Sequence, residues 1–287
     1  MPFDIMATVN SRRDFLYFAA ATAFPLLAKI NSEYKGVIFG AQSYSFRDRS
    51  LDEAIEAYKQ CGLGYAELFS GHVEPRNEAE RKKWRTSPES IQQAKQIKKK
   101  FDQAGVRIYA FNYSFRKNHT DEEVLHGMRI AKAMGTKFIT ASSTVDQAKR
   151  LNDLAAREGV FVAMHNHSNV KDPNEFATPE SFYKAMEGNP HIRINLDIGH
   201  FVAANYDPVE FIQKNYRNIV TLHIKDRKKN QGPNVPFGEG DTPIKEVLQL
   251  LQKNRWKIPA MIEYEYKGGD TIAEVKRCYE YCRKVLG

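Results

Sequence analysis

The sequence predicts a single (β/α)8 TIM barrel, preceded by a short leading segment. Eight β-rich runs alternate with eight stretches that are apolar at three- and four-residue spacing. A strand followed by a helix, eight times over, is typical of this fold. The chain has 287 residues and 42% hydrophobic content, which is enough for one barrel core. We therefore expect one barrel domain over residues 36–287.

The expected strands are rich in β-branched and aromatic residues and cover residues 36–44, 65–69, 106–114, 137–143, 160–167, 192–199, 219–225 and 258–265. The expected helices cover residues 51–61, 88–104, 121–134, 145–158, 178–187, 207–215, 243–254 and 271–285. Gly62, Gly105 and Gly159 follow three of these helices, as C-cap glycines do. A doubly wound open sheet is the alternative, but the chain shows no glycine-rich dinucleotide loop.

The first 35 residues differ from the rest of the chain. Arg12 and Arg13 precede about 14 mainly apolar residues, a run too short to span a membrane comfortably. The string Ser-Arg-Arg-Asp-Phe-Leu resembles the twin-arginine export signal. We expect residues 1–35 to be such a signal segment and the protein to be periplasmic or otherwise exported. A cytoplasmic protein with an amphipathic N-terminal helix and an uncleaved membrane anchor are the alternatives.

Charge and cysteine content exclude some classes of protein. The formal net charge is +8, but the basic residues are mixed with 35 acidic ones, which does not favour a nucleic-acid partner. The three cysteines, Cys61, Cys278 and Cys282, form neither a disulfide framework nor a CxxC pair. We expect them to be buried thiols.

Polar residues end the last four expected strands. These endings are His165-Asn166-His167, Asp197 to His200, His223 to Asp226, and Glu263 to Glu265. Because the active site of a (β/α)8 barrel lies at the C-terminal ends of its strands, we expect the four endings to converge. Imidazole nitrogens and carboxylate oxygens together suit one divalent ion, such as Mn²⁺, Co²⁺, Zn²⁺, Fe²⁺ or Mg²⁺.

The order of these motifs resembles that of the sugar phosphate isomerase/epimerase superfamily, the xylose isomerase-like barrels. The strings that carry the resemblance are YAELF, HNH, LDIGH, HIKD, FGEGD and IEYE, and the resemblance covers nearly all of residues 36–287. It implies that one metal ion is held by His165, Asp197, His223 and Glu263. One position departs from the pattern, because many epimerases have a glutamate where this chain has His165. A branch of the family with an H-N-H motif shares the histidine.

The resemblance also implies roles for residues around the metal. Glu263, His167 and Lys225 are the expected base, acid and oxyanion partner, and Glu67, His200, Glu265 and Tyr113 are expected to bind substrate. Simpler interpretations stay open for some of them. In these interpretations His200 is an ordinary loop histidine, and Lys225 is the ion-pair partner of Asp226. The aromatic residues either wall a sugar pocket or pack under loops; they are Tyr44, Phe46, Tyr113, Phe115 and Trp84.

The expected activity is metal-dependent isomerisation or epimerisation of a carbohydrate. A base removes the proton next to a carbonyl, an enediolate forms, and a second group returns the proton. The alternatives are elimination of the aglycone from a 3-keto-glycoside, as in the histidine-bearing branch, and an inosose-type dehydration. A non-catalytic sugar-binding barrel would lack the ligand set. Family IV apurinic endonucleases share the barrel, but they hold three metals with about twice as many ligands.

The twin-arginine interpretation predicts that residues 1–35, fused to a reporter protein, carry the folded reporter across the membrane. Replacing the arginine pair in the double variant Arg12→Lys, Arg13→Lys should stop this transport, because the export machinery reads both guanidinium groups. Cell fractionation measures the result. Transport that persists in the double variant would contradict the interpretation.

Overall fold

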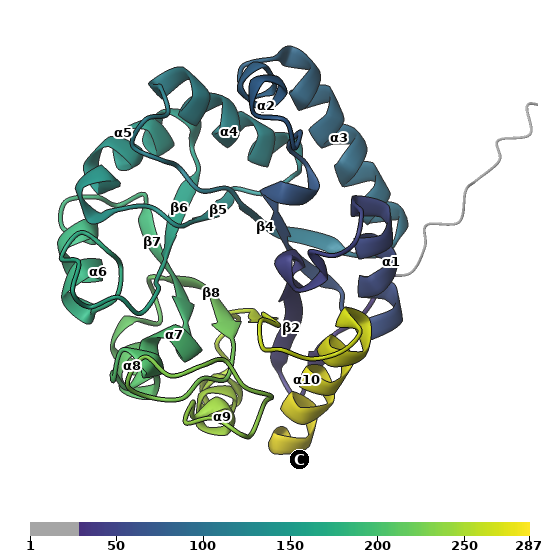
Figure 1. Ribbon diagram of the computed structural model, residues 1–287, viewed down its shortest axis with the longest axis vertical. Coiled ribbons are helices and arrows are strands. Elements are labelled where there is room, and N and C mark those ends of the chain that lie inside the picture. The colour runs from purple at the N-terminus through teal and green to yellow at the C-terminus, as the bar shows by residue number, and fades with distance from the viewer. Residues whose placement is uncertain (1–28) are drawn as a thin grey trace, which may run out of the picture.

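The computed structural model describes residues 29–287, and at its centre eight parallel strands form a closed barrel (Figure 1). Each strand pairs with the next along the chain, and the first pairs with the last. The strands are β2 (Val37–Gln42), β3 (Tyr65–Phe69), β4 (Arg107–Asn112), β5 (Phe138–Ala141), β6 (Phe161–His165), β7 (Ile192–Asp197), β8 (Ile219–Ile224) and β9 (Ala260–Ile262). The predicted barrel is confirmed.

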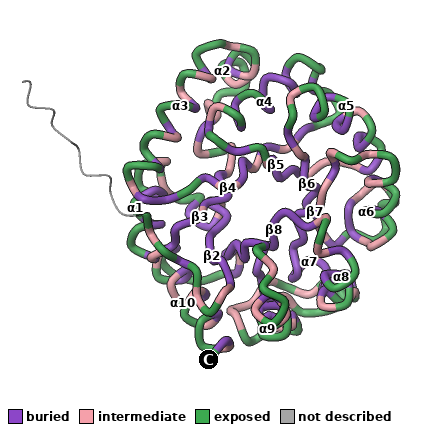
Figure 2. Tube along the Cα trace, turned by 180° about the vertical axis from the view of Figure 1, so that it is seen from behind, coloured by how far each residue is buried: buried purple, intermediate pink, exposed green. Residues whose placement is uncertain are grey.

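Eight helices surround the barrel where the sequence predicts them. They are α1 (Leu51–Cys61), α3 (Pro88–Gln103), α4 (Asp121–Ala133), α5 (Ala148–Glu158), α6 (Pro179–Met186), α8 (Pro208–Asn215), α9 (Ile244–Asn254) and α10 (Thr271–Leu286). Their apolar faces pack on the strands, and their exposed residues face outward (Figure 2). Gly62 and Gly159 end α1 and α5 in the left-handed conformation, with φ of 68° and 67°, as a C-cap glycine does.

The loops contain short elements that the sequence pattern did not predict. Two are α-helices, α2 (Glu78–Trp84) and α7 (Ile198–Ala203). Two more are 3-10 turns, η1 (Ser43–Phe46) and η2 (Ser70–His72), whereas a third 3-10 turn, η3 (Val145–Gln147), forms the start of the helix expected over 145–158. Helix α7 follows β7 without a loop because the Asp197 carboxylate accepts the backbone N–H of His200 at 2.7 Å and caps the helix. The LDIGH motif is therefore a junction between a strand and a helix.

The folded barrel begins ahead of the boundary expected at residue 36. Strand β1 (Glu33–Tyr34) pairs antiparallel with β2. The Ser32 hydroxyl donates to Phe39 O at 2.6 Å and accepts from Gly64 N at 2.9 Å. The Arg12-Arg13 motif lies outside the described residues. Within residues 29–287, no helix is both long and apolar enough to cross a lipid bilayer.

The three cysteines lie in the packing of α1 and α10, as expected for buried thiols. Cys61, Cys278 and Cys282 are free and buried. Burial raises the pKa of the Cys61 and Cys278 thiols to about 12, because the thiolate would lose its hydration. These groups are therefore protonated and unreactive in the folded protein.

Asp226 organises the loop between β8 and α9. Its buried carboxylate accepts the backbone N–H groups of Gly238, Gly240 and Thr242 at 2.8, 3.0 and 3.2 Å. A Cβ atom on Gly240 would lie 1.8 Å from Asp226 Oδ1, so only glycine fits there. The FGEGD string thus wraps around the aspartate of HIKD. Lys225 does not pair with Asp226, so that interpretation of Lys225 is wrong; its ammonium group contacts other carboxylates.

We expect Asp226→Ala to lower the free energy of unfolding by about 2–3 kcal/mol, because three backbone donors lose a charged acceptor. Equilibrium urea denaturation measures the change. Asp241→Ala is the matched control in the same loop, since Asp241 is exposed and accepts only the Lys229 N–H among backbone donors. Equal losses in the two variants would contradict the role of Asp226.

Candidate metal centre

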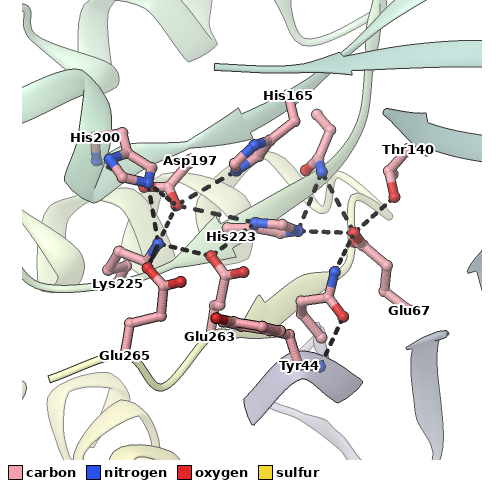
Figure 3. A network of polar contacts seen from close by, with 12 residues as sticks. Tyr44, Glu67, Thr140, His165, Asp197, His200, His223, Lys225, Glu263 and Glu265 are labelled. Atoms are coloured by element: carbon pink, nitrogen blue, oxygen red, sulfur yellow. Dashed lines mark hydrogen bonds and ion pairs between the residues drawn. The ribbon is translucent and has the colours of Figure 1, made fainter. Parts of the chain in front are cut away.

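Four buried side chains converge at the C-terminal ends of β6 to β9. They belong to His165, Asp197, His223 and Glu263, and one ligand-type atom from each lies within 4.8 Å of the other three (Figure 3). His165 Nε2 lies 3.6 Å from Asp197 Oδ2, and His223 Nδ1 lies 3.1 Å from Glu263 Oε2. The sequence named these four residues as metal ligands, and the fold brings them together.

The hydrogen bonding of these four residues fits a metal site. Nε2 of His165, Oδ2 of Asp197, Nδ1 of His223 and Oε2 of Glu263 are buried and form no hydrogen bond of good geometry, although Lys225 Nζ forms ion pairs with the two carboxylate oxygens. Buried polar atoms normally have hydrogen-bond partners, so four such atoms close together indicate room for a ligand. Two imidazole nitrogens and two carboxylate oxygens suit a borderline divalent ion. The group could therefore hold a metal ion.

The charges around the centre lead to the same conclusion. Lys225 Nζ lies 2.9 Å from Asp197, 2.8 Å from Glu263 and 2.5 Å from Glu265. Burial opposes the charged ammonium form, but the three carboxylates outweigh it and raise the lysine pKa above its usual value. The three carboxylates thus outnumber this ammonium group, and a divalent ion would add positive charge beside them.

Asn166, between the two histidines of the HNH motif, was not singled out from the sequence. Its side-chain amide donates to Asp197 O at 3.1 Å and accepts from Asp197 N at 2.9 Å. This pair of hydrogen bonds links the end of β6 to the end of β7. Asn166 therefore holds the backbone of one ligand at a fixed distance from another, His165. Its position between a predicted ligand, His165, and a predicted catalytic residue, His167, was the available signal.

Glu67 lies beneath the centre, inside the barrel, and contacts a ligand. Its Oε1 atom accepts from Thr140 Oγ1 at 2.7 Å and lies 2.9 Å from His223 Nε2. Burial disfavours a charged His223, but Glu67 and Glu263 raise its pKa well above the usual value. The contact orients the ring so that Nδ1 faces the centre, as an outer carboxylate does for a metal-bound histidine. Glu67, an expected substrate binder, does not line the pocket above.

A pocket of about 300 Å³ opens above the centre. The aromatic rings of Tyr44 and Phe69 meet edge to face at 5.1 Å and form part of its wall. The other expected aromatic residues, Phe46, Phe115 and Trp84, are buried in the hydrophobic core. Tyr113 lies in a neighbouring cavity. The residues that line the pocket are Gln42, Tyr44, Phe69, Asn112, Ser114, Ser142, His165, His167, His200, His223, Lys225, Glu263 and Glu265.

His167 is the most accessible of the histidines at the pocket. Its side chain is 42% exposed, and its Nδ1 atom lies 2.7 Å from Glu175 Oε1. Its ring lies 4.9 Å from that of His165, between ring centroids. When Nδ1–H donates a hydrogen bond to Glu175, Nε2 carries no proton and can accept one from a substrate. Glu175 lies in the loop after β6, and nothing in the local sequence pattern marked it.

His200 lies between two cations. Its Nε2 atom is 3.2 Å from Lys225 Nζ, and its Nδ1 atom is 2.6 Å from Arg227 Nη1. Burial and then Lys225 lower its pKa well below the usual value, against the opposite effect of Asp197. The imidazole is therefore neutral and able to accept a hydrogen bond. Arg227 also contacts Ser168 and Gly232 and so orders the rim.

Comparisons with known proteins agree with this fold. L-ribulose-5-phosphate 3-epimerase of Escherichia coli is 27% identical over 170 residues, which are 55% of this chain and 57% of that protein. The chain thus spans little more than half the length of the curated relatives it matches.

Two solved structures share the fold. The 3-keto-D-glucoside 4-epimerase of Escherichia coli is 13% identical with a TM-score of 0.67, and the similarity covers 86% of this chain and 99% of that one. The IolI protein, solved with a bound zinc atom, is 16% identical with a TM-score of 0.66, over 87% and 98% of the two chains. Residues 55–284 match the family described as xylose isomerase-like TIM barrel. Since this match covers most of the chain, the protein belongs to the xylose isomerase-like TIM barrel family.

Proposed function

We propose that the protein is a divalent-metal-dependent sugar isomerase or epimerase that removes a proton next to a carbonyl group. The observation that carries the proposal is the cluster of four buried ligand-type atoms, from His165, Asp197, His223 and Glu263, under a pocket of sugar size. Its relatives and structural neighbours include an L-ribulose-5-phosphate 3-epimerase and a 3-keto-D-glucoside 4-epimerase, which supports carbohydrate as the substrate class.

A bound divalent ion would polarise the carbonyl and make the adjacent carbon-bound proton more acidic. Glu263 takes this proton in the proposed reaction. Its carboxylate lies between His223 and Lys225 at the floor of the pocket. The Lys225 ammonium stabilises the enediolate oxygen by its charge. His167, held through Nδ1 by Glu175, exchanges a proton through Nε2.

Elimination is the second candidate, and His165 is the residue that favours it. The epimerases that the sequence resembles carry a glutamate there, and their proton-transfer pair consists of two carboxylates. In this chain His165 replaces one of these two carboxylates, so Glu263 is the carboxylate that remains. In an elimination, a base takes the C2 proton of a 3-keto-glycoside, the C1–C2 double bond forms, and the C1–O bond breaks. His167 then protonates the departing aglycone oxygen, so no second carboxylate is required.

Export by the twin-arginine route, which we also propose, bears on the choice of substrate. An exported enzyme meets few sugar phosphates. Free sugars, oxidised sugars and glycosides are therefore the favoured substrates.

The metal proposal predicts about one divalent ion per chain, as for a site with one set of ligands. His165→Ala, Asp197→Ala and His223→Ala should each lose the ion. Glu67→Gln should bind it about 10–100-fold more weakly, because His223 loses its charged partner. Elemental analysis and titration against a chelator measure both effects. Asp241→Ala should keep full occupancy, because Asp241 does not line the pocket and is not among the four ligands. Two or three ions per chain, or full occupancy in His165→Ala, would contradict the ligand set.

The catalytic proposal predicts that the metal-loaded protein in D₂O exchanges the proton next to the carbonyl of a keto-sugar or 3-keto-glycoside. NMR follows the exchange. Epimerised or isomerised sugar supports the first candidate, and release of aglycone supports the second. His167→Ala should keep the ion and lose about 10²–10⁴-fold in rate, because proton transfer through an imidazole is removed.

His191→Ala is the control for this experiment, since His191 contacts Val160 O and does not line the pocket. It should keep both the ion and the rate. Absence of both proton exchange and aglycone release with every keto-sugar and 3-keto-glycoside would remove the catalytic proposal. A wild-type rate in His167→Ala would remove only the role of His167.

A further inference from the structure

A second, larger cavity lies beside the metal pocket. Its volume is about 590 Å³, against about 300 Å³ for the pocket itself. Phe69, at the end of β3, and Ser114, just beyond β4, line both spaces. The two cavities are therefore neighbours along one wall. The side cavity is enclosed by the loop after β3, by α2 and by the loop between β4 and α4.

The side cavity contains a group of buried polar side chains that the metal centre does not use. Arg85 forms two contacts with the Glu74 carboxylate, at 2.8 and 3.3 Å, and its Nη1 atom lies 2.7 Å from His119 Nε2. The Glu74 side chain is 9% exposed and that of Arg85 is 16% exposed. The guanidinium group also lies 5.6 Å from the ring centre of Tyr113. Burial and Arg85 lower the pKa of His119 to about 4, so this histidine is neutral.

Tyr113 supplies an independent sign of a missing ligand. The residue is 1% exposed, and its hydroxyl is buried and forms no hydrogen bond of good geometry, although the Glu74 carboxylate lies beside it. The ring is firmly placed, since it stacks on Phe111 at 5.4 Å and meets Phe115 edge to face at 5.3 Å. Leaving a buried hydroxyl unpaired costs free energy. A polar group in the side cavity would satisfy it.

The composition of the cavity favours a hydroxyl-rich ring over an anion. Arg85 is paired with Glu74, and the other charged side chains of the lining are of mixed sign: Arg81, Lys82 and Arg116 with Glu78 and Glu123. Planar guanidinium and carboxylate groups bind adjacent hydroxyls through paired hydrogen bonds, and an aromatic ring such as that of Phe69 covers the apolar face of a sugar. A phosphate group would instead have to compete with Glu74 for Arg85.

We propose that the side cavity binds a second sugar ring, so that the substrate is a disaccharide-type glycoside whose reacting ring lies over the metal centre. This inference rests on the proposed function for the identity of the reacting ring. Tyr113 and Arg85 bind hydroxyls of the linked ring, and Phe69 and Ser114 border the glycosidic linkage. Tyr113, expected from the sequence to bind substrate, takes that role in the neighbouring cavity.

The test uses titration calorimetry to compare how two classes of unreactive probe bind to the metal-loaded full chain. One class is a panel of α- and β-linked glucose disaccharides. The other consists of the methyl glucosides that match the reacting ring of each disaccharide. We expect the best disaccharide to bind at least about tenfold more tightly than its methyl glucoside, as paired hydrogen bonds to a second ring would give. Tyr113→Phe should weaken disaccharide binding about three- to tenfold and Arg85→Gln about ten- to hundredfold. Neither change should affect the methyl glucoside.

Tyr113→Phe removes only an unpartnered hydroxyl, so the variant keeps its fold. Tyr216→Phe is the matched control, because Tyr216 stacks on Trp256 at 4.2 Å and lines neither cavity. Equal affinity for both probes, or an unchanged preference in Tyr113→Phe and Arg85→Gln, would overturn the proposal. So would Arg85-dependent binding of inorganic phosphate that displaces the disaccharide. Since neither probe carries a keto group, these results are independent of whether the protein catalyses proton exchange.

Discussion

Three carboxylates, of Asp197, Glu263 and Glu265, meet a single buried ammonium group, that of Lys225, at the mouth of the barrel. Charges in such a place are stable only when they are compensated, because burial removes their hydration. The charge of Lys225 alone leaves these four side chains with a net charge of −2. Further positive charge would stabilise this group, and the divalent ion that we propose would supply it.

Buried charges also require compensation deeper inside the barrel. Glu67 brings another negative charge beneath His223, and Gln42, Thr140 and His223 surround its Oε1 atom. One imidazole thus connects the inner carboxylate to the outer one of Glu263. The barrel is consequently divided into an apolar layer between strands and helices and a polar column along its axis. The column gives the ligands a fixed orientation, which a catalytic centre requires.

The centre has two unlike sides. On one side Glu263 and Lys225 are buried and charged. On the other, His165 is buried and His167 is accessible, with Glu175 as its partner. A reaction in which one group removes a proton and a different kind of group returns or donates one suits this asymmetry. The side cavity bordered by Phe69 and Ser114 extends the metal pocket and offers room for a leaving group.

The fold and the convergence of the four polar strand endings followed from the sequence because both depend on patterns along the chain, whereas the choice of the four expected ligands came from the family resemblance. Alternating strands and helices specify the barrel, and a barrel brings strand ends together whatever their distance in sequence. The tertiary structure decided what depends on side-chain direction. Glu67 contacts His223 beneath the pocket, and Tyr113 lines the neighbouring cavity. Asn166, Glu175 and Arg227 contact residues of the site, although hydrophobic periodicity does not mark their positions. Residue spacing determines which face a residue occupies, but the packing of neighbouring strands and loops determines which atoms come within hydrogen-bonding distance.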